Sequence, residues 1–299
     1  MITRPAKLQP GDRVAILGAS SASGMTAEEI EKNVRSMDLE PVLYESATAR
    51  HGNLAGTDYI RSRDINLAFA DDSIKGIIAI QGGYGFQRVL PLLDWEMIKA
   101  HPKFFGGFSD VTAMLVPLNN CGMESYHMPM PGSWIKADEF SRSKIRSILF
   151  DDVITYENPE GYPRKTLVGG KAEGPLAGGN LSMLTSSMGT PYEIQTEGKI
   201  LFIEDVHEAT YRIDRMLTQM RNAGLLQKAN GIVFGTFTDY EEPDPARNLT
   251  LAQILEEIVV PLGKPCFLGL QCGHCRPTLT LPMGRMVCID ADACEMIEN

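Results

Sequence analysis

The first 120 residues alternate between short apolar runs and helix-like stretches, and this alternation constrains the fold more than any other feature. Thr26 is followed three residues later by Glu29, the pattern of a capping box, which predicts a helix beginning after Thr26. Strands that alternate with helices form a parallel sheet with right-handed crossovers. We expect strands at 12–17, 41–44, 75–80 and 103–108, and helices after Thr26, at 58–71 and from Asp110.

In the second half of the chain the regular alternation of strand and helix signals is lost, which predicts a second domain. Residues 158–163 are rich in turn formers and indicate a connection between domains. We therefore expect an N-terminal parallel-sheet α/β domain at 1–150, a linker at 151–170 and a mixed α+β domain at 171–299. In the second domain, strands are expected at 199–203, 231–234 and 287–289, and helices at 211–222 and 251–260.

Net charge and hydropathy exclude several classes of partner. The chain carries a formal net charge of −10, which disfavours binding to phosphate backbones and to anionic membranes. No apolar run reaches the length of a membrane span, and the N-terminus shows no apolar signal region. We therefore expect a cytoplasmic protein with reduced cysteines, no nucleic-acid partner and no membrane partner.

The segment Cys272-Gly273-His274-Cys275 has the spacing of a thiol–disulfide exchange motif. Such a motif needs a helix after it to lower the thiol pKa, but Pro277 and a strand-like TLTLP run follow instead. No second Cys/His pair has the spacing of a zinc site. We expect no metal and no cofactor, and redox chemistry at this segment stays a minor alternative.

Ser109 stands where a catalytic nucleophile could be placed. It follows a buried strand and begins a helix, and in open α/β sheets sites form beyond the carboxyl ends of strands. A serine at such a turn exposes its hydroxyl, while the helix N-terminus offers N–H groups to an oxyanion. The alternative is that Ser109 or Asp110 only caps the helix.

The glycine-rich loop at 81–85 follows the next buried strand. Its backbone N–H groups could bind a phosphate or another anion, or form a second wall of an oxyanion hole beside Ser109. The loop lacks the G-x-G-x-x-G spacing and no Walker lysine follows, so the nucleotide signal is weak. An ordinary tight turn is the alternative.

A serine nucleophile needs a base, usually a histidine that a carboxylate orients. His51 and His101 lie in polar, loop-like surroundings, whereas His127, His207 and His274 are ranked nearly equally by their surroundings.

Glu204 follows the apolar run 200–203, so it is expected to end a buried strand and to need a partner there. A buried ion pair with Arg212 or Arg215 is the alternative to a catalytic role.

Taken together, several segments of this chain resemble the L,D-carboxypeptidase family, which includes muropeptide L,D-carboxypeptidases and microcin C immunity proteins. The resemblance spans nearly the whole chain, in the family's order and at suitable spacing. In this sequence the matching segments are LQPGD (8–12), LAGTD (54–58), QGGYG (81–85), GFSDVT (107–112), GGNLS (178–182), GTP (189–191), IED (203–205), YRIDRM (211–216), GH (273–274) and LPMG (281–284). Gln81 stands where the family usually has Arg.

The resemblance implies the role of each site residue. Ser109 would be the nucleophile, His274 its base and Glu204 the group that orients this base. The backbone N–H groups of Asp110 and Gly83 would form the oxyanion hole. Three further residues are expected to contact the substrate: Gly82, Tyr84 and His127.

The resemblance also implies the reaction, which is release of the terminal D-Ala from peptidoglycan tetrapeptides by a homodimeric serine carboxypeptidase. The partner would be a muropeptide or another small peptide. A microcin-immunity-type peptidase that cuts a toxic peptidyl nucleotide is the nearest alternative. A nonenzymatic ligand-binding protein on the same fold is the alternative of another class.

Overall fold

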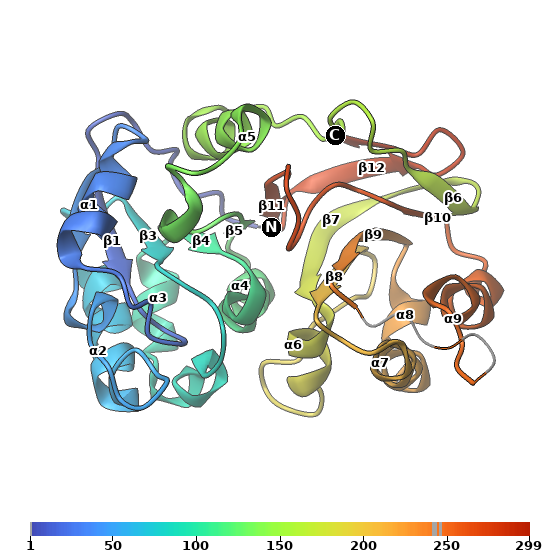
Figure 1. Ribbon diagram of the computed structural model, residues 1–299, viewed down its shortest axis with the longest axis horizontal. Helices are drawn as coiled ribbons and strands as arrows, with labels where there is room; N and C mark the ends of the chain where they lie inside the picture. The colour runs from blue at the N-terminus through green and yellow to red at the C-terminus, as the bar shows by residue number, and fades with distance from the viewer. Residues whose placement is uncertain (1, 241–243, 245–246) are drawn as a thin grey trace. The chain divides into compact units, whose positions relative to one another are not determined.

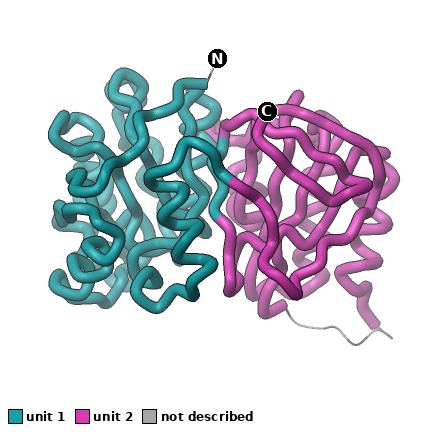
Figure 2. Tube along the Cα trace, turned by 90° about the horizontal axis from the view of Figure 1, so that it is seen from above, with its two compact units in different colours: residues 1–154, 280–283 teal, residues 155–279, 284–299 magenta. Residues whose placement is uncertain are grey.

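The computed structural model describes residues 2–240, 244 and 247–299, and the chain divides into two units (Figure 2). The first unit runs to Ile154 and also contains Thr280–Met283. The second unit contains Thr155–Leu279 and Gly284–Asn299. Each unit is built around its own sheet.

The first unit confirms the α/β domain that the alternating pattern predicts. Its sheet has the strand order β11-β5-β4-β3-β1-β2, and all neighbours are parallel except β11 and β5. Both faces of the central strands are buried, as a parallel sheet covered on both sides requires. The strands are β1 (Arg13–Leu17), β2 (Glu40–Leu43), β3 (Gly76–Ala79), β4 (Phe104–Gly107), β5 (Ser125–His127) and β11 (Leu281–Met283).

The strand order reverses between β1 and β3. The chain moves from β1 to β2 through α1, and then returns through α2 to the other side of β1. Right-handed crossovers in opposite directions put α1 and α2 on opposite faces, and Figure 1 shows α2, α3 and α4 along one side of the sheet. Ligands bind where the strand order reverses in this way. The helices are α1 (Ala27–Arg35), α2 (Asp58–Ala70), α3 (Trp95–Ala100), α4 (Thr112–Asn120) and α5 (Glu139–Phe150).

The capping box predicted for the first helix is present. The Thr26 hydroxyl accepts the Glu29 N–H, and the Thr26 N–H donates to the Glu29 carboxylate at 2.8 Å. The helix expected from Asp110 begins instead with a 3₁₀ turn at Ser109–Val111, and α4 follows it.

The second unit has a mixed sheet, as the sequence predicts. The strand order is β13-β12-β7-β8-β9-β10-β6, in which β7 to β10 are parallel and the outer strands are antiparallel. Its strands are β6 (Lys165–Val168), β7 (Lys171–Asn180), β8 (Ile200–Val206), β9 (Gly231–Thr238), β10 (Cys266–Leu268), β12 (Met286–Asp290) and β13 (Glu295–Glu298). Its helices are α6 (Leu181–Ser186), α7 (Thr210–Asn222), α8 (Leu225–Lys228) and α9 (Leu251–Ile258).

Three details differ from the sequence-based expectation. The span 151–170, expected as a linker, contains β6, which pairs with β10 about a hundred residues later. The TLTLP run supplies β11, which joins the first unit's sheet although it lies within the span assigned to the second domain. β8 does not end at Glu204 but continues to Val206. Each difference depends on a pairing partner that is distant in sequence.

Within the part of the chain that the structure describes, no helix is both long enough and apolar enough to cross a bilayer.

Arg61 on α2 ties together the loops that follow β1 and β3. Its guanidinium is fully buried and donates to the carbonyl oxygens of Ala19 at 2.5 Å and Gly85 at 2.8 Å. Asp58, one turn earlier on the helix, accepts from the same guanidinium. A buried cation is stable only with such partners, so this side chain fixes the spacing of the two loops.

We expect Arg61→Met to lower the free energy of unfolding of the first unit by about 3 kcal/mol, because two buried carbonyls and a carboxylate lose a charged donor. Both tryptophans, Trp95 and Trp134, belong to this unit, so urea denaturation followed by tryptophan fluorescence reports on it selectively. Arg35→Met removes an exposed guanidinium that also has two carboxylate partners, and should leave the midpoint nearly unchanged. Equal midpoints for the two variants would contradict the role assigned to Arg61.

Candidate active site

Ser109 occupies a strained turn directly beyond β4. Its φ is +64°, a left-handed conformation that residues with a side chain rarely adopt. The N-cap positions of the 3₁₀ turn and of α4 are Phe108 and Val111, and neither Ser109 nor Asp110 caps a helix with its side chain. The capping alternative is therefore wrong. A strand–turn–helix with a strained serine is the geometry of a nucleophile elbow.

The glycine-rich loop after β3 packs against this elbow. A β-carbon on Gly82 would lie 3.2 Å from Ser109 Oγ and 3.5 Å from the Asp110 nitrogen. The buried Asp110 carboxylate accepts the Phe86 N–H at 2.9 Å, which links the two loops. No acceptor among the described residues takes up the N–H of Gly83 or Asp110. Two available N–H groups thus belong to the loops that meet at Ser109, which is what an oxyanion hole requires.

The other two residues expected to contact the substrate differ in exposure. His127 ends β5 and is 2% exposed, and its ring lies edge-on to Phe108 with centroids 5.8 Å apart. Tyr84 is 56% exposed. His127 can therefore shape the wall behind the elbow, while Tyr84 presents its ring to solvent.

In the second unit, a histidine and a carboxylate form a close pair. His274 Nδ1 lies 2.7 Å from Glu204 Oε2, although the two residues are 70 positions apart. The Glu204 side chain is fully buried, and that of His274 is 18% exposed. The β8–β9 pairing is irregular at Glu204, and such a bulge re-aims a side chain. A carboxylate that orients an imidazole supplies two of the three members of a serine-hydrolase triad.

The structure also bears on the alternatives to the Glu204–His274 pair. Arg212 lies against Tyr211 and Glu208 rather than Glu204, so the buried Arg–Glu pair with Arg212 is wrong. The His207 side chain is 73% exposed, and its nearest carboxylate is Asp239 at 3.9 Å. Of the histidines that the sequence ranked together, His274 is the one with a buried carboxylate at hydrogen-bond distance.

Burial raises the pKa of Glu204, and the hydrogen bond with His274 opposes that rise. The carboxylate therefore carries a desolvation cost that the imidazole partly offsets. Gly273 makes the close approach possible. Its φ is +122°, and a β-carbon there would lie 2.6 Å from Glu204 Oε2. Only glycine allows the backbone to pass this close to the carboxylate.

A second carboxylate, Asp205, ties the end of β8 to the start of α6. It accepts from Asn180 Nδ2 at 2.9 Å, from the Ser182 N–H at 2.9 Å and from the Ser182 hydroxyl at 2.8 Å. This network fixes the backbone next to Glu204. Sequence reasoning placed all three residues in motifs but gave them no role, because only folding shows that they converge.

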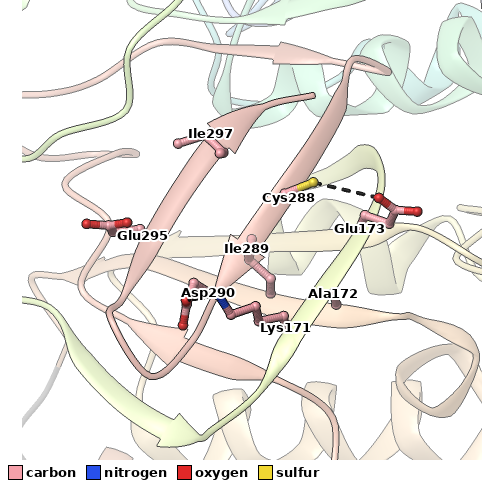
Figure 3. A pocket seen from close by; sticks show the side chains of 8 residues that line it. All are labelled: Lys171, Ala172, Glu173, Cys288, Ile289, Asp290, Glu295 and Ile297. Atoms are coloured by element: carbon pink, nitrogen blue, oxygen red, sulfur yellow. Dashed lines mark hydrogen bonds and ion pairs between the residues drawn. The ribbon is translucent and has the colours of Figure 1, made fainter.

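Residues that the structure describes in the second unit line surface hollows. One, of about 690 Å³, is lined by His274, Arg276 and residues of β9, β10 and α9. Figure 3 shows the other, of about 440 Å³, over β7, β12 and β13, where Lys171 pairs with Asp290 at 2.8 Å. In that second hollow Cys288 lies 3.8 Å from Glu173, and burial raises the pKa of the Cys288 thiol, which keeps it a poor nucleophile. Of these two hollows, the first lies beside His274.

The Cys272–Cys275 segment lacks the surroundings of a redox site. Cys272 is fully buried, its Sγ lies 3.4 Å from the Leu279 carbonyl oxygen, and burial raises its pKa well above the ordinary value. The next regular element is β11, not a helix. Within the described residues, no three His, Cys, Asp or Glu side chains converge as metal ligands.

Comparison with known proteins matches this chain to a peptidase family. Residues 14–128 match the LD-carboxypeptidase N-terminal domain, and residues 173–289 match the LD-carboxypeptidase C-terminal domain. The probable murein peptide carboxypeptidase of Bacillus subtilis is 36% identical over 94% of this chain and 89% of its own length.

Solved structures agree with the sequence matches. The muramoyltetrapeptide carboxypeptidase from Oxalobacter formigenes superposes with a TM-score of 0.82 at 29% identity, covering 96% of this chain and 99% of that one. MccF in complex with glutamyl sulfamoyl guanosine superposes with a TM-score of 0.89 at 23% identity, covering 99% and 98% of the two chains. The second likeness shows the fold alone.

We expect Glu204→Gln to stabilise the protein at neutral pH, because it removes a buried negative charge whose desolvation raises the pKa of the carboxyl. The pKa of Glu204 is higher in the folded than in the unfolded chain, so the folded state binds the proton more tightly. The destabilising effect of the carboxylate is therefore absent below its ordinary pKa and grows as pH rises through the folded-state pKa. Calorimetry at several pH values should show the gain at pH 7 and its disappearance near pH 4. A variant that is less stable than wild type at pH 7 would contradict this account.

We expect the double variant Cys272→Ser, Cys275→Ser to keep peptidase activity within a few-fold of wild type, because burial raises the pKa of the Cys272 thiol and no helix follows the motif to lower it. Steady-state assays with and without dithiothreitol provide the measurement. Abolished activity in the folded double variant would revive the redox alternative.

Proposed function

Because the chain belongs to the LD-carboxypeptidase family, we propose that it releases the terminal D-Ala from peptidoglycan tetrapeptides by a Ser109–His274–Glu204 triad. As a member of this family it is a serine-type carboxypeptidase. The names of two relatives, a probable murein peptide carboxypeptidase and a muramoyltetrapeptide carboxypeptidase, support the substrate. The observation that carries the triad is the buried Glu204 carboxylate 2.7 Å from the His274 ring.

In the proposed mechanism, Ser109 Oγ attacks the carbonyl before the terminal D-Ala while His274 accepts the serine proton. The N–H groups of Gly83 and Asp110 stabilise the oxyanion of the tetrahedral intermediate. His274 then protonates the leaving amine, and D-Ala departs. Water attacks the acyl-enzyme by the same route in reverse, with His274 again as base.

Glu204 acts on His274 rather than on the substrate. By accepting a hydrogen bond from the Nδ1–H group, Glu204 fixes the tautomer in which Nε2 is free to take the serine proton. Its negative charge stabilises the imidazolium that forms at each transfer. Burial strengthens this interaction because no water competes for the carboxylate.

We also propose a cytoplasmic homodimer, on the resemblance to the family. Two other functions remain as outcomes of the tests. One is a peptidase of the microcin-immunity type, which would cut a peptidyl nucleotide in place of a muropeptide. The other is a binding protein that carries the triad residues without using them.

We expect wild-type protein to remove one D-Ala from a peptidoglycan tetrapeptide, and Ser109→Ala and His274→Ala to lower kcat by at least about 10³-fold. Mass spectrometry of the tetrapeptide and its product measures this. His207→Ala removes an exposed imidazole and serves as the matched control, with activity close to wild type.

Two results would contradict the proposal in different ways. If wild type leaves the tetrapeptide intact but cleaves a peptidyl nucleotide, the enzyme is of the microcin-immunity type. If Ser109→Ala cleaves as fast as wild type, the nucleophile is wrongly assigned.

A further inference from the structure

We propose that Ser21 is a positioning residue that holds the Gly83 N–H in the orientation needed to stabilise an oxyanion. This inference rests on the proposed function, in which that N–H forms one side of the oxyanion hole. Ser21 lies in the loop after β1 and belongs to none of the short motifs by which the sequence resembles the family. Its role emerges from two hydrogen bonds to the glycine-rich loop.

Ser21 forms hydrogen bonds with the backbone on both sides of Gly83. The Ser21 N–H donates to the Gly82 carbonyl oxygen at 3.1 Å, and the Ser21 hydroxyl accepts the Tyr84 N–H at 3.1 Å. The Gly82 carbonyl and the Gly83 N–H belong to one planar peptide unit, in which they point in opposite directions. Holding the carbonyl toward Ser21 therefore directs the Gly83 N–H away from Ser21. The bond to Tyr84 fixes the next peptide unit.

The glycine-rich loop needs such a restraint. Gly83 has a φ of +102°, and glycine has more conformational freedom than any other residue. A β-carbon at Gly83 would collide with Ser21 Oγ, so the serine hydroxyl packs directly against the glycine. An oxyanion hole is effective only when its donors are oriented before the reaction, and a misplacement of about 1 Å can cost about 100-fold in rate.

Ser21 is itself held firmly. It forms an isolated antiparallel bridge with Leu54, and the flanking Ala22 N–H donates to the Asn53 carbonyl at 2.9 Å. The Ala55 N–H donates to the Ser20 carbonyl at 3.0 Å. The backbone of residues 53–55 thus holds the loop that contains Ser21, and Ser21 in turn holds the glycine-rich loop. Such secondary contacts keep a catalytic group in place.

The adjacent serine offers a matched control. Ser20 is fully buried, and its hydroxyl makes no hydrogen bond within the described part of the chain. Ser20→Ala and Ser21→Ala remove the same atom from neighbouring residues of one loop. Only the second removes the acceptor for the Tyr84 N–H.

Ser21→Ala keeps the backbone bond to the Gly82 carbonyl but removes the acceptor of the Tyr84 N–H, so the peptide unit after Gly83 loses its restraint. We expect this to lower kcat for the tetrapeptide about 10-fold with KM changed less than about 3-fold, because the restraint acts on the transition state. Ser20→Ala should stay within about 2-fold of wild type in both constants. Ser21→Thr keeps the hydroxyl and should recover most of the lost kcat. A purely structural role would lower the amount of folded enzyme, and a titration of active sites corrects for that.

A second measurement does not depend on knowing the peptide substrate. A fluorophosphonate probe labels an activated serine through the same oxyanion hole, and intact-mass spectrometry gives the rate. We expect Ser21→Ala to be labelled at least about 10-fold more slowly than wild type or Ser20→Ala. The Tyr84 amide should also exchange its hydrogen faster in Ser21→Ala.

The outcomes separate the two proposals. Labelling and cleavage by Ser21→Ala at the wild-type rate, with Ser109→Ala inert, would overturn the role of Ser21 while leaving the proposed function intact. Labelling that persists in Ser109→Ala, or its absence in wild type, would overturn the proposed function and this inference with it. A kcat loss that Ser20→Ala shares would also overturn it, since the effect would then belong to the loop as a whole.

Discussion

The buried carboxylate of Glu204 is the group on which the second unit's candidate site depends. Removing a negative charge from water is costly, and the surrounding structure is arranged to make it tolerable. The irregular pairing between β8 and β9 turns the side chain, and Gly273 lets the next segment approach without a β-carbon in the way. The His274 ring then supplies the partner. The same arrangement that satisfies Glu204 orients His274 for proton transfer.

In the first unit, the candidate site depends on holding a serine and backbone N–H donors in a fixed orientation. The strained φ of Ser109 is held by the strand before it and the helix after it, with Asp110 fastened to the Phe86 N–H. The glycine-rich loop is held from behind, by Ser21 and by the buried guanidinium of Arg61. Loops built from glycine provide room for a substrate but little rigidity, so neighbouring side chains must provide it.

Much of the fold followed from local patterns. The alternating apolar runs predicted the parallel sheet, and the helix starts at Thr26 and Asp58 agreed with their capping residues because caps act within one turn. The elbow at Ser109 was likewise visible as a serine between a buried strand and a helix. The strands that the sequence analysis missed or ended too early share one cause. β6, β11 and the extension of β8 exist because of partners far away in the chain, and no window of sequence contains both members of such a pair.

By itself, the sequence determined the fold class, the position of the Ser109 turn and, through its ordered motifs, the family. These are properties of local periodicity, turn chemistry and motif order. Only the tertiary structure decided which histidine faces Glu204, and how Ser21 and Arg61 hold the glycine-rich loop by hydrogen bonds. It also decided which backbone N–H groups near Ser109 have no acceptor among the described residues. Those contacts join residues dozens of positions apart, and they form only when the burial of whole strands brings distant loops to the same edge of a sheet.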